Sequence, residues 1–290
     1  MKIIIAILLL SSFMSCVPQV EQSTTRSGGS APFVPGPATP FRWSQSLLTN
    51  GLNIKLADEF RNDFSGSDYD SNGRDLIEQM MMKWNAADSS RTYFAIPAAS
   101  VANKDYSSLS QYQDGELGIY KSHSWFSDVS SSALAVTQFY AIRRNAGAST
   151  EYLELTHADI IVNYRDHQFS TDAFSSLDYD LPSVLIHELG HFIGMQHNSN
   201  YYESSVMQPY MGTRDVFRAL YSADQANLLN LYNGATSLTT SDSGFRAAAK
   251  VAAPNEGEEV SGYFELRTDG ICKHYINHEF IGEHSVVPMN

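Results

Sequence analysis

The chain has only two cysteines among its 290 residues, Cys16 and Cys272. Two thiols form at most one disulfide, so a scaffold held together by several disulfides is excluded. They are also too few for a thiolate metal cluster. Any metal ion bound by this chain must therefore be held by histidine, aspartate or glutamate.

Basic residues are also scarce. Lys and Arg total 19 against 32 Asp and Glu, which gives a formal net charge of -13. A nucleic-acid-binding protein needs a basic surface for the phosphate backbone, so the charge argues against that class. It also argues against binding to anionic lipid through charge alone. Apolar residues make up 43% of the chain, enough for a sizeable core, which excludes a wholly disordered protein.

The apolar run Ile3–Leu10 is too short to span a bilayer. It follows Lys2 and precedes small serines, an arrangement typical of a secretory signal peptide, which we predict over residues 1–15. Residues 13–16 (Phe-Met-Ser-Cys) resemble a bacterial lipobox, in which the cysteine is acylated. The alternative is an ordinary secretory signal with an incidental cysteine. Both interpretations predict an exported protein, either secreted or held at the outer membrane or cell surface by a lipid on Cys16.

Composition divides the rest of the chain into three parts. Residues 16–44 are rich in Ser, Gly and Pro and predict an anchor cysteine followed by a flexible linker. Residues 45–235 carry the periodic segments of a folded domain. Residues 236–290 begin with a small, polar, acidic linker and end in a tail that is too short for a core of its own. The sequence leaves the role of this tail open.

The hydrophobic pattern of the central part alternates between strand and helix periods. An amphipathic helix is expected at 182–194, with a proline near its first turn. The mixture predicts an α+β fold. We expect further helices at 74–87 and 222–232, strands at 51–57, 93–96, 133–142 and 158–164, and a tail hairpin formed by 263–266 and 271–276.

His187, His191 and His197 form the pattern on which the functional prediction depends. The first two are four apart on a predicted helix, so both imidazoles project from one face. This spacing suits two nitrogen ligands on one zinc ion. Gly194 can adopt a positive φ, which would end the helix and bring His197 back as a third ligand. Three imidazoles leave a fourth position for water, which indicates a catalytic zinc site.

Glu188 lies beside the first histidine, where its carboxylate can reach a water on the metal without binding the metal itself. Zinc acidifies such a water and polarises a carbonyl, so we expect Glu188 to take the water's proton and pass it to the leaving amine. The alternative is a buried helix with incidental histidines. Three histidines within eleven residues are hard to satisfy in a core without a metal, so we favour the zinc site.

The segment His187–His197 resembles the zinc motif of the metzincin peptidases. Met207 follows in Ser-Val-Met-Gln-Pro, which is similar to the family's Met-turn, and by resemblance its thioether forms an apolar floor near the zinc. The Met-x-Pro order with Pro209, the Ala-Asp-Ile at 158–160 and the helix at 222–232 are similar to the matrixin branch, in its compact bacterial form. The resemblance implies a metzincin-like fold, with a twisted mixed sheet, the active-site helix beneath it and a C-terminal helix.

One catalytic Zn2+ is expected, without additional structural Zn2+ or Ca2+. Only 27 residues lead from Ile160 to the first histidine of the motif, fewer than vertebrate matrixins use there for those ions. His157, Asp159, Asp166 and His167 could in principle bind a second ion, but we interpret them as solvated loop residues.

Tyr210 and Val184 are candidates to line the pocket for the substrate residue after the scissile bond. A wall position suits Tyr210 better than zinc ligation, because Tyr210 lies three rather than two residues after Met207. The strand at 133–139 could pair with an extended peptide by strand addition. Cys272 is expected to be an ordinary free thiol, with zinc ligation from the tail as the alternative.

The leading prediction is a secreted or lipid-anchored zinc endopeptidase that hydrolyses peptide bonds in proteins. We expect a monomer that binds no nucleic acid and contacts a membrane only through its N-terminal lipid. Two alternatives stay open. The chain could be a zinc-binding adhesion module without turnover, or a latent protease in which residues 241–290 block the cleft.

Overall fold

The computed structural model describes residues 39–198, 200, 202–234, 246–247, 255–276 and 279–285. The predicted signal peptide, Cys16 and nearly all of the predicted linker lie outside these residues, as does the side chain of Cys272. The helices of the described part are α1 (Leu76–Ala87), α2 (Leu181–Phe192) and α3 (Ser222–Tyr232). Among the described residues, none of the helices is both long and apolar enough to cross a bilayer.

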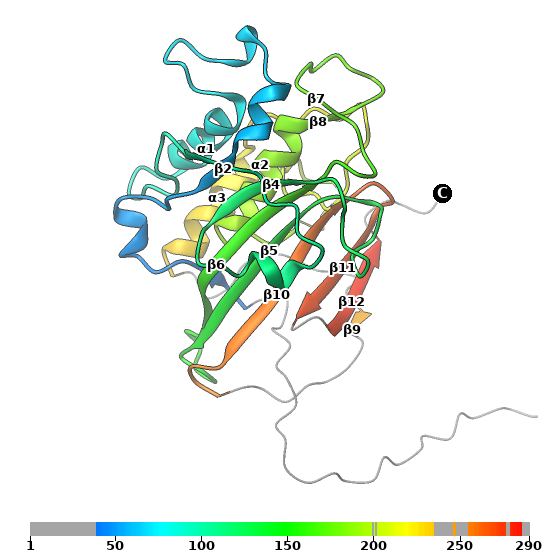
Figure 1. The fold of residues 1–290 in the computed structure, drawn as a ribbon. Helices are drawn as coiled ribbons and strands as arrows, with labels where there is room; N and C mark the ends of the chain where they lie inside the picture. Colours follow the sequence, from blue (N-terminus) through cyan, green and yellow to red (C-terminus); the bar gives the residue numbers. More distant parts are fainter. Residues whose placement is uncertain are drawn as a thin grey trace, which may run out of the picture. The chain divides into compact units, whose positions relative to one another are not determined.

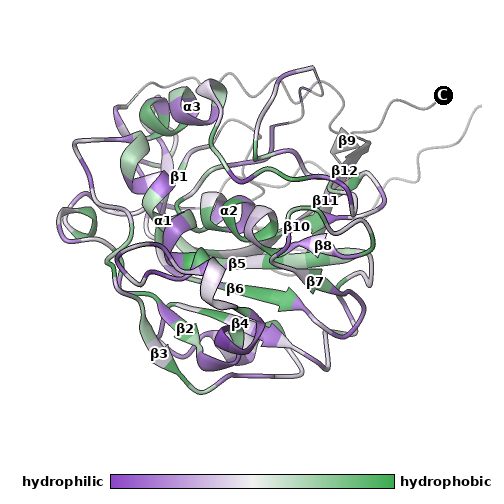
Figure 2. Ribbon diagram, turned by 90° about the horizontal axis from the view of Figure 1, so that it is seen from above, coloured by the Kyte–Doolittle hydropathy of each residue, from purple (hydrophilic) through white to green (hydrophobic). Residues whose placement is uncertain are grey.

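Most strands join one sheet, in the order β3-β2-β4-β6-β5-β10-β11-β12-β9, with β1 also beside β6. The strands are β1 (Phe41–Arg42), β2 (Lys55–Ala57), β3 (Ala99–Val101), β4 (Gly118–Ser122), β5 (Ala133–Arg144), β6 (Tyr152–Asn163), β7 (Phe169–Ser170), β8 (Tyr179–Asp180), β9 (Arg246–Ala247), β10 (Glu259–Arg267), β11 (Ile271–Ile276) and β12 (Glu279–Ser285). The neighbours β3, β2, β4 and β6 run parallel to one another. From β6 onward, through β5, β10, β11, β12 and β9, each strand runs antiparallel to the next. The three helices lie on one face of β5 and β6 (Figures 1 and 2), which confirms the predicted α+β class.

Local patterns predicted some elements better than others. α3 spans the predicted residues 222–232, and β5 contains the predicted strand 133–142. The predicted strand 93–96 is reduced to a single bridge between Phe94 and Leu52. β4 was not predicted, because all five of its residues are buried and no polar alternation marks it. Even Lys121 lies inside, where its ammonium pairs with Asp63 at 2.8 Å.

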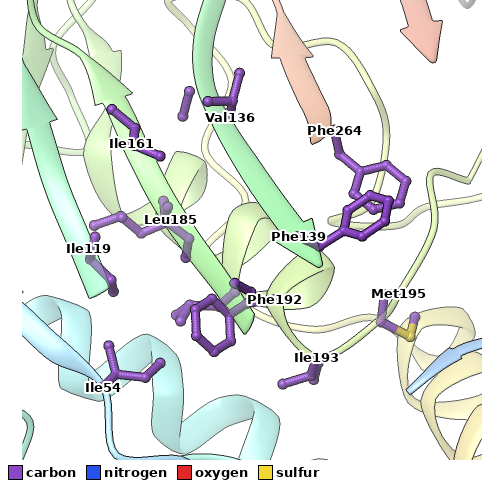
Figure 3. Packing of buried hydrophobic residues seen from close by; sticks show 14 of the residues in the cluster. Ile54, Ile119, Val136, Phe139, Ile161, Leu185, Phe192, Ile193, Met195 and Phe264 are labelled. Carbon is purple, nitrogen blue, oxygen red and sulfur yellow. The ribbon is translucent and has the colours of Figure 1, made fainter. Parts of the chain in front are cut away.

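α2 is buried on every side, which corrects the prediction of an amphipathic helix. A helix enclosed in this way belongs to the core between two layers. One side faces the sheet, where Leu185 and Phe192 pack among β-strand side chains (Figure 3). On other sides two tryptophans donate indole N–H groups to its carbonyls, Trp84 to Ile186 at 2.9 Å and Trp43 to Phe192 at 2.7 Å. These contacts fix the helix that carries the zinc motif.

Asp88 lies at the C-terminal end of α1, and its carboxylate accepts several hydrogen bonds. These bonds predict a contribution to stability that depends on pH. Burial alone would raise the pKa of its carboxyl, but hydrogen bonds from Ser90, Arg91 and Tyr93 outweigh burial and lower the pKa to about 2. A carboxyl whose pKa is lowered in the folded state stabilises the fold at pH values above its ordinary pKa of 3.8. This contribution is lost as the pH falls toward about 2.

We therefore expect Asp88→Asn to lower the free energy of unfolding by about 2 kcal/mol at neutral pH. The difference from wild type should shrink steadily below about pH 4. Urea denaturation of both proteins across this range measures it. A difference that stays constant with pH would show that the carboxylate charge plays no part.

Candidate metal centre

The three histidines of the motif meet in one buried cluster. α2 carries His187 and His191, and the loop after it carries His197. One ring nitrogen of each lies within 4.8 Å of the others, and the side chains are 1%, 2% and 5% exposed. Among the described residues, this is the one group of three or more histidine, cysteine or carboxylate side chains close enough to share an ion.

Hydrogen bonds fix the tautomers of the two helix histidines. Nδ1 of His187 lies 2.7 Å from the Val206 carbonyl, and Nδ1 of His191 lies 2.8 Å from the Met195 carbonyl. A carbonyl oxygen can only accept, so in each ring Nδ1 carries the proton and Nε2 presents a lone pair. A hydrogen bond from the ring nitrogen that does not bind the metal is the usual way in which proteins orient a metal-binding imidazole.

The two Nε2 atoms lie 2.9 Å apart. Two lone pairs at this distance repel each other unless a cation or a proton lies between them. Burial lowers the pKa of His187 to about 4, although the hydrogen bond to Val206 opposes this, so a proton is disfavoured at neutral pH. A divalent cation satisfies both nitrogens. The donor set of three neutral imidazoles fits zinc.

Gly194 turns the chain after α2 and brings His197 back to the cluster. Its φ is +90°, a conformation that side chains of L residues rarely adopt. The space is closed as well, because an added Cβ would lie 2.0 Å from the carbonyl oxygen of Phe41. The next amide, that of Met195, then donates to the Gly190 carbonyl at 2.9 Å.

We expect Gly194→Ala to lower the free energy of unfolding by about 3 kcal/mol or more, since positive φ and a backbone clash act together. Gly234→Ala is the matched control. Gly234 has a similar φ of +81°, but an added Cβ there meets nothing within 4 Å. It should lower stability by only about 1 kcal/mol. Urea denaturation compares the two variants, and equal losses would rule out the clash with Phe41.

The turn around Met207 supports the cluster from the other side. Met207 is 1% exposed, and its sulfur fills the space that a Cβ on Gly190 would need. Its carbonyl accepts the Asn198 amide at 2.8 Å, next to the third histidine. Asp224, at the start of α3, accepts from the Ser205 hydroxyl at 2.5 Å and from the Val206 amide at 3.1 Å. α3 thus positions the carbonyl that orients His187.

Glu188 is fully buried between α2 and β5. One of its oxygens accepts from the Thr137 hydroxyl at 2.5 Å, and the other has no hydrogen-bond partner among the described residues. Burial raises the pKa of its carboxyl to about 8, while Thr137 and the Leu266 amide oppose this and Glu265 adds to it. A cation held by the histidines would lower this pKa again.

Two residues of this site were not predicted. Thr137 left a weak signal, as a hydroxyl in an otherwise apolar strand. Phe264 left none, because it belongs to the tail. Its ring stacks on His191 with centroids 4.4 Å apart and planes 7° apart.

The candidate pocket residues lie in different places. Tyr210 lines a pocket of about 330 Å³ beside the Met207 turn, together with Phe217 and Tyr221. Val184 is fully buried in α2 and is not among the residues that line this pocket. The Pro209 carbonyl accepts the amide of Arg267 at 3.3 Å.

The interpretation of His157 and Asp159 as solvated loop residues was wrong. They lie in β6, where they are 6% and 0% exposed, rather than in a solvated loop. Nε2 of His157 lies 2.6 Å from the Asp159 carboxylate, whose other oxygen accepts the Gly118 amide at 2.8 Å. The pair therefore ties β6 to β4. Asp166 is engaged by Arg165 in the turn beyond.

The model of the matrixin family matches residues 78–233, more than half of the chain. The match runs from α1 to the end of α3 and includes the three histidines, Glu188 and the Met207 turn. A comparison with curated proteins found no match to the chain. The resemblance seen in the zinc motif is thus confirmed over residues 78–233, and the chain belongs to the matrixin family of zinc metallopeptidases.

Proposed function

We propose that this chain is a zinc-dependent endopeptidase that hydrolyses internal peptide bonds in proteins. One observation carries the proposal. The Nε2 atoms of His187 and His191 lie 2.9 Å apart with their lone pairs facing each other, and the carboxylate of Glu188 follows His187 directly in the chain. Membership of a peptidase family supports the same reaction.

Different residues of the chain have different roles in the proposed hydrolysis. His187, His191 and His197 would hold the zinc, which supplies Lewis acidity to polarise a scissile carbonyl and acidify a water molecule. Glu188 accepts a proton from the attacking water and donates it to the departing amine nitrogen. Thr137 holds one carboxylate oxygen of Glu188, so that the other is presented in a fixed direction.

A zinc-binding module without turnover is the competing function. Such a module would need the three histidines but not a carboxylate buried beside them. Burying a carboxyl without full hydrogen bonding lowers stability, so its presence beside the histidines favours catalysis. We also propose that the protein is exported and anchored through an acylated Cys16. Loss of membrane association in Cys16→Ser would support this, whereas unchanged fractionation would contradict it.

The test uses the zinc-loaded protein, unfolded casein and a zinc chelator. We expect cuts within the casein chain, which stop with the chelator and resume when zinc is restored. Sequencing of the products separates endopeptidase activity from trimming at the ends. Intact casein after incubation with both the wild-type chain and the Gly262→Val variant described below would reject the proposal.

A further inference from the structure

We propose that β10 occupies the substrate position of the cleft, so that the full chain is a latent peptidase inhibited by its own C-terminal segment. The inference rests on the proposed function and concerns the regulation of the same site. Figure 1 shows β10 directly beside β5, on the side away from β6.

β10 pairs with β5 along its whole length. The register runs antiparallel from Glu259 opposite Ile142 to Arg267 opposite Ala133. Thr137, the residue that holds Glu188, lies opposite Phe264. β5 has β6 on its other edge, so β10 takes the edge at which an extended peptide would add as a strand.

The opposite edge of β10 is bonded to the loop after Met207. The Arg267 amide donates to the Pro209 carbonyl at 3.3 Å, and the Arg267 carbonyl accepts the Met211 amide at 3.1 Å. Tyr210 forms a parallel bridge to the same residue. β10 is therefore enclosed at this end between β5 and the loop that carries Tyr210. A second extended chain cannot use these backbone groups at the same time.

Two side chains of β10 point toward the metal centre and the core. Phe264 covers the imidazole of His191 and packs against Phe139 with ring centroids 5.3 Å apart (Figure 3). Leu266 is 1% exposed, and its amide faces the Glu188 carboxylate. The backbone from Phe264 to Leu266 thus passes across both the base and a metal ligand. The scissile peptide bond of a substrate would have to occupy the same space beside Glu188 and His191.

On the other face of β10, contacts within the tail itself keep the segment rigid. The Glu265 carboxylate and the Arg267 guanidinium form a buried ion pair at 2.7 Å, and Arg267 also pairs with Asp269 at 2.6 Å. Tyr263 stacks on Tyr275 of β11, with ring centroids 4.6 Å apart. The tail is bonded to the domain at both ends of β10, since the Arg143 amide donates to the Glu258 carbonyl at 3.0 Å and the Thr268 amide donates to the Ser132 carbonyl at 3.0 Å. A segment tethered to its own site competes with free substrate at high effective concentration.

Gly262→Val in the full chain tests the proposal. Gly262 lies opposite Phe139 of β5 and Ile276 of β11. A Cβ there would lie 2.4 Å from the Tyr275 carbonyl and 2.8 Å from the Phe139 ring. Valine strains the pairing with β11 and the packing against Phe139, so the fraction of chains in which β10 stays on β5 should fall. We expect casein hydrolysis to rise at least about tenfold, because the open fraction limits the rate of the latent chain.

Ile271→Ser is the matched control. It changes a partly exposed side chain of the same tail, 37% exposed at the start of β11. It should leave hydrolysis within about twofold of wild type, as expected of a surface substitution. Phe264→Ala provides a second release variant if the valine variant proves unstable. It removes the ring over His191 but adds no clash, and it should also raise the rate.

A binding measurement makes the test independent of turnover. In a Glu188→Gln background, a fluorescent peptide with the sequence of residues 258–268 should bind the zinc-loaded Gly262→Val chain. It should bind far less to the chain with Gly262, whose cleft is occupied. Fluorescence polarisation reports both.

The outcomes separate the two proposals. Equal casein hydrolysis by wild type and both release variants, with equal peptide binding, overturns latency and leaves the peptidase function standing. Peptide binding only to the released chain, without hydrolysis by any chain, supports occupation of the cleft by β10 and rejects the peptidase function.

Discussion

Glu188→Gln should lower casein hydrolysis by about a thousandfold while zinc stays bound. General acid–base catalysis typically contributes on the order of 100- to 10,000-fold, and Glu188 is the buried carboxylate next to His187 on α2. Glutamine keeps the shape of the side chain and can still accept the Thr137 hydrogen bond. It cannot accept a proton from water at neutral pH, so the rate falls without loss of the fold. Initial rates in the wild-type and Gly262→Val backgrounds measure the effect.

The matched control for this substitution is Glu78→Gln. Glu78 is also a buried helical glutamate, and it accepts the Ala98 amide at 2.9 Å, a bond that a glutamine oxygen can keep. It lies on α1, outside the histidine cluster. Hydrolysis should therefore stay within about threefold of the parent protein. A Glu188→Gln protein that retained most of its activity would remove Glu188 from the role of base.

His191→Ala should abolish zinc binding and the stability that zinc provides. The substitution removes one of three ligands and the Nδ1 bond to Met195. Zinc stabilises the native state by RT ln(1 + [Zn]/Kd), about 4 kcal/mol when free zinc is about 1,000 times Kd. We expect the wild-type chain to show such a gain in urea denaturation and the variant to show none.

His123→Ala separates this effect from a general loss of an imidazole. The side chain of His123 is 52% exposed, and its ring lies near Glu59, away from the cluster. The zinc-dependent gain should be unchanged in this variant. A gain that persists in His191→Ala would mean that the ion binds elsewhere.

The zinc motif could be predicted because its geometry is local. The spacing of His187 and His191 follows from the helical repeat, and the turn at Gly194 requires only a residue that tolerates positive φ. The position of β10 could not be predicted, since it depends on pairing between segments more than a hundred residues apart in the chain. Phe264 has no sequence relation to His191, and only the sheet order brings the two rings together.

Burial of polar groups explains the other differences from the predictions. β4 was missed because Lys121 lies inside with its charge paired. His157 and Asp159 were interpreted as solvated loop residues, whereas their mutual hydrogen bond allows both to be buried in β6. In each case a partner distant in the chain also supports burial, Asp63 for Lys121 and the Gly118 amide for Asp159.

The most direct test of the zinc peptidase is a titration of the metal-free chain with zinc, followed by casein hydrolysis at each step. Hydrolysis should be absent at the start, rise in proportion to added zinc and level off at one equivalent. The Glu188→Gln chain should bind the same single equivalent and cleave casein about a thousandfold more slowly. Hydrolysis before zinc is added, or equal hydrolysis by the Glu188→Gln chain, would contradict the account.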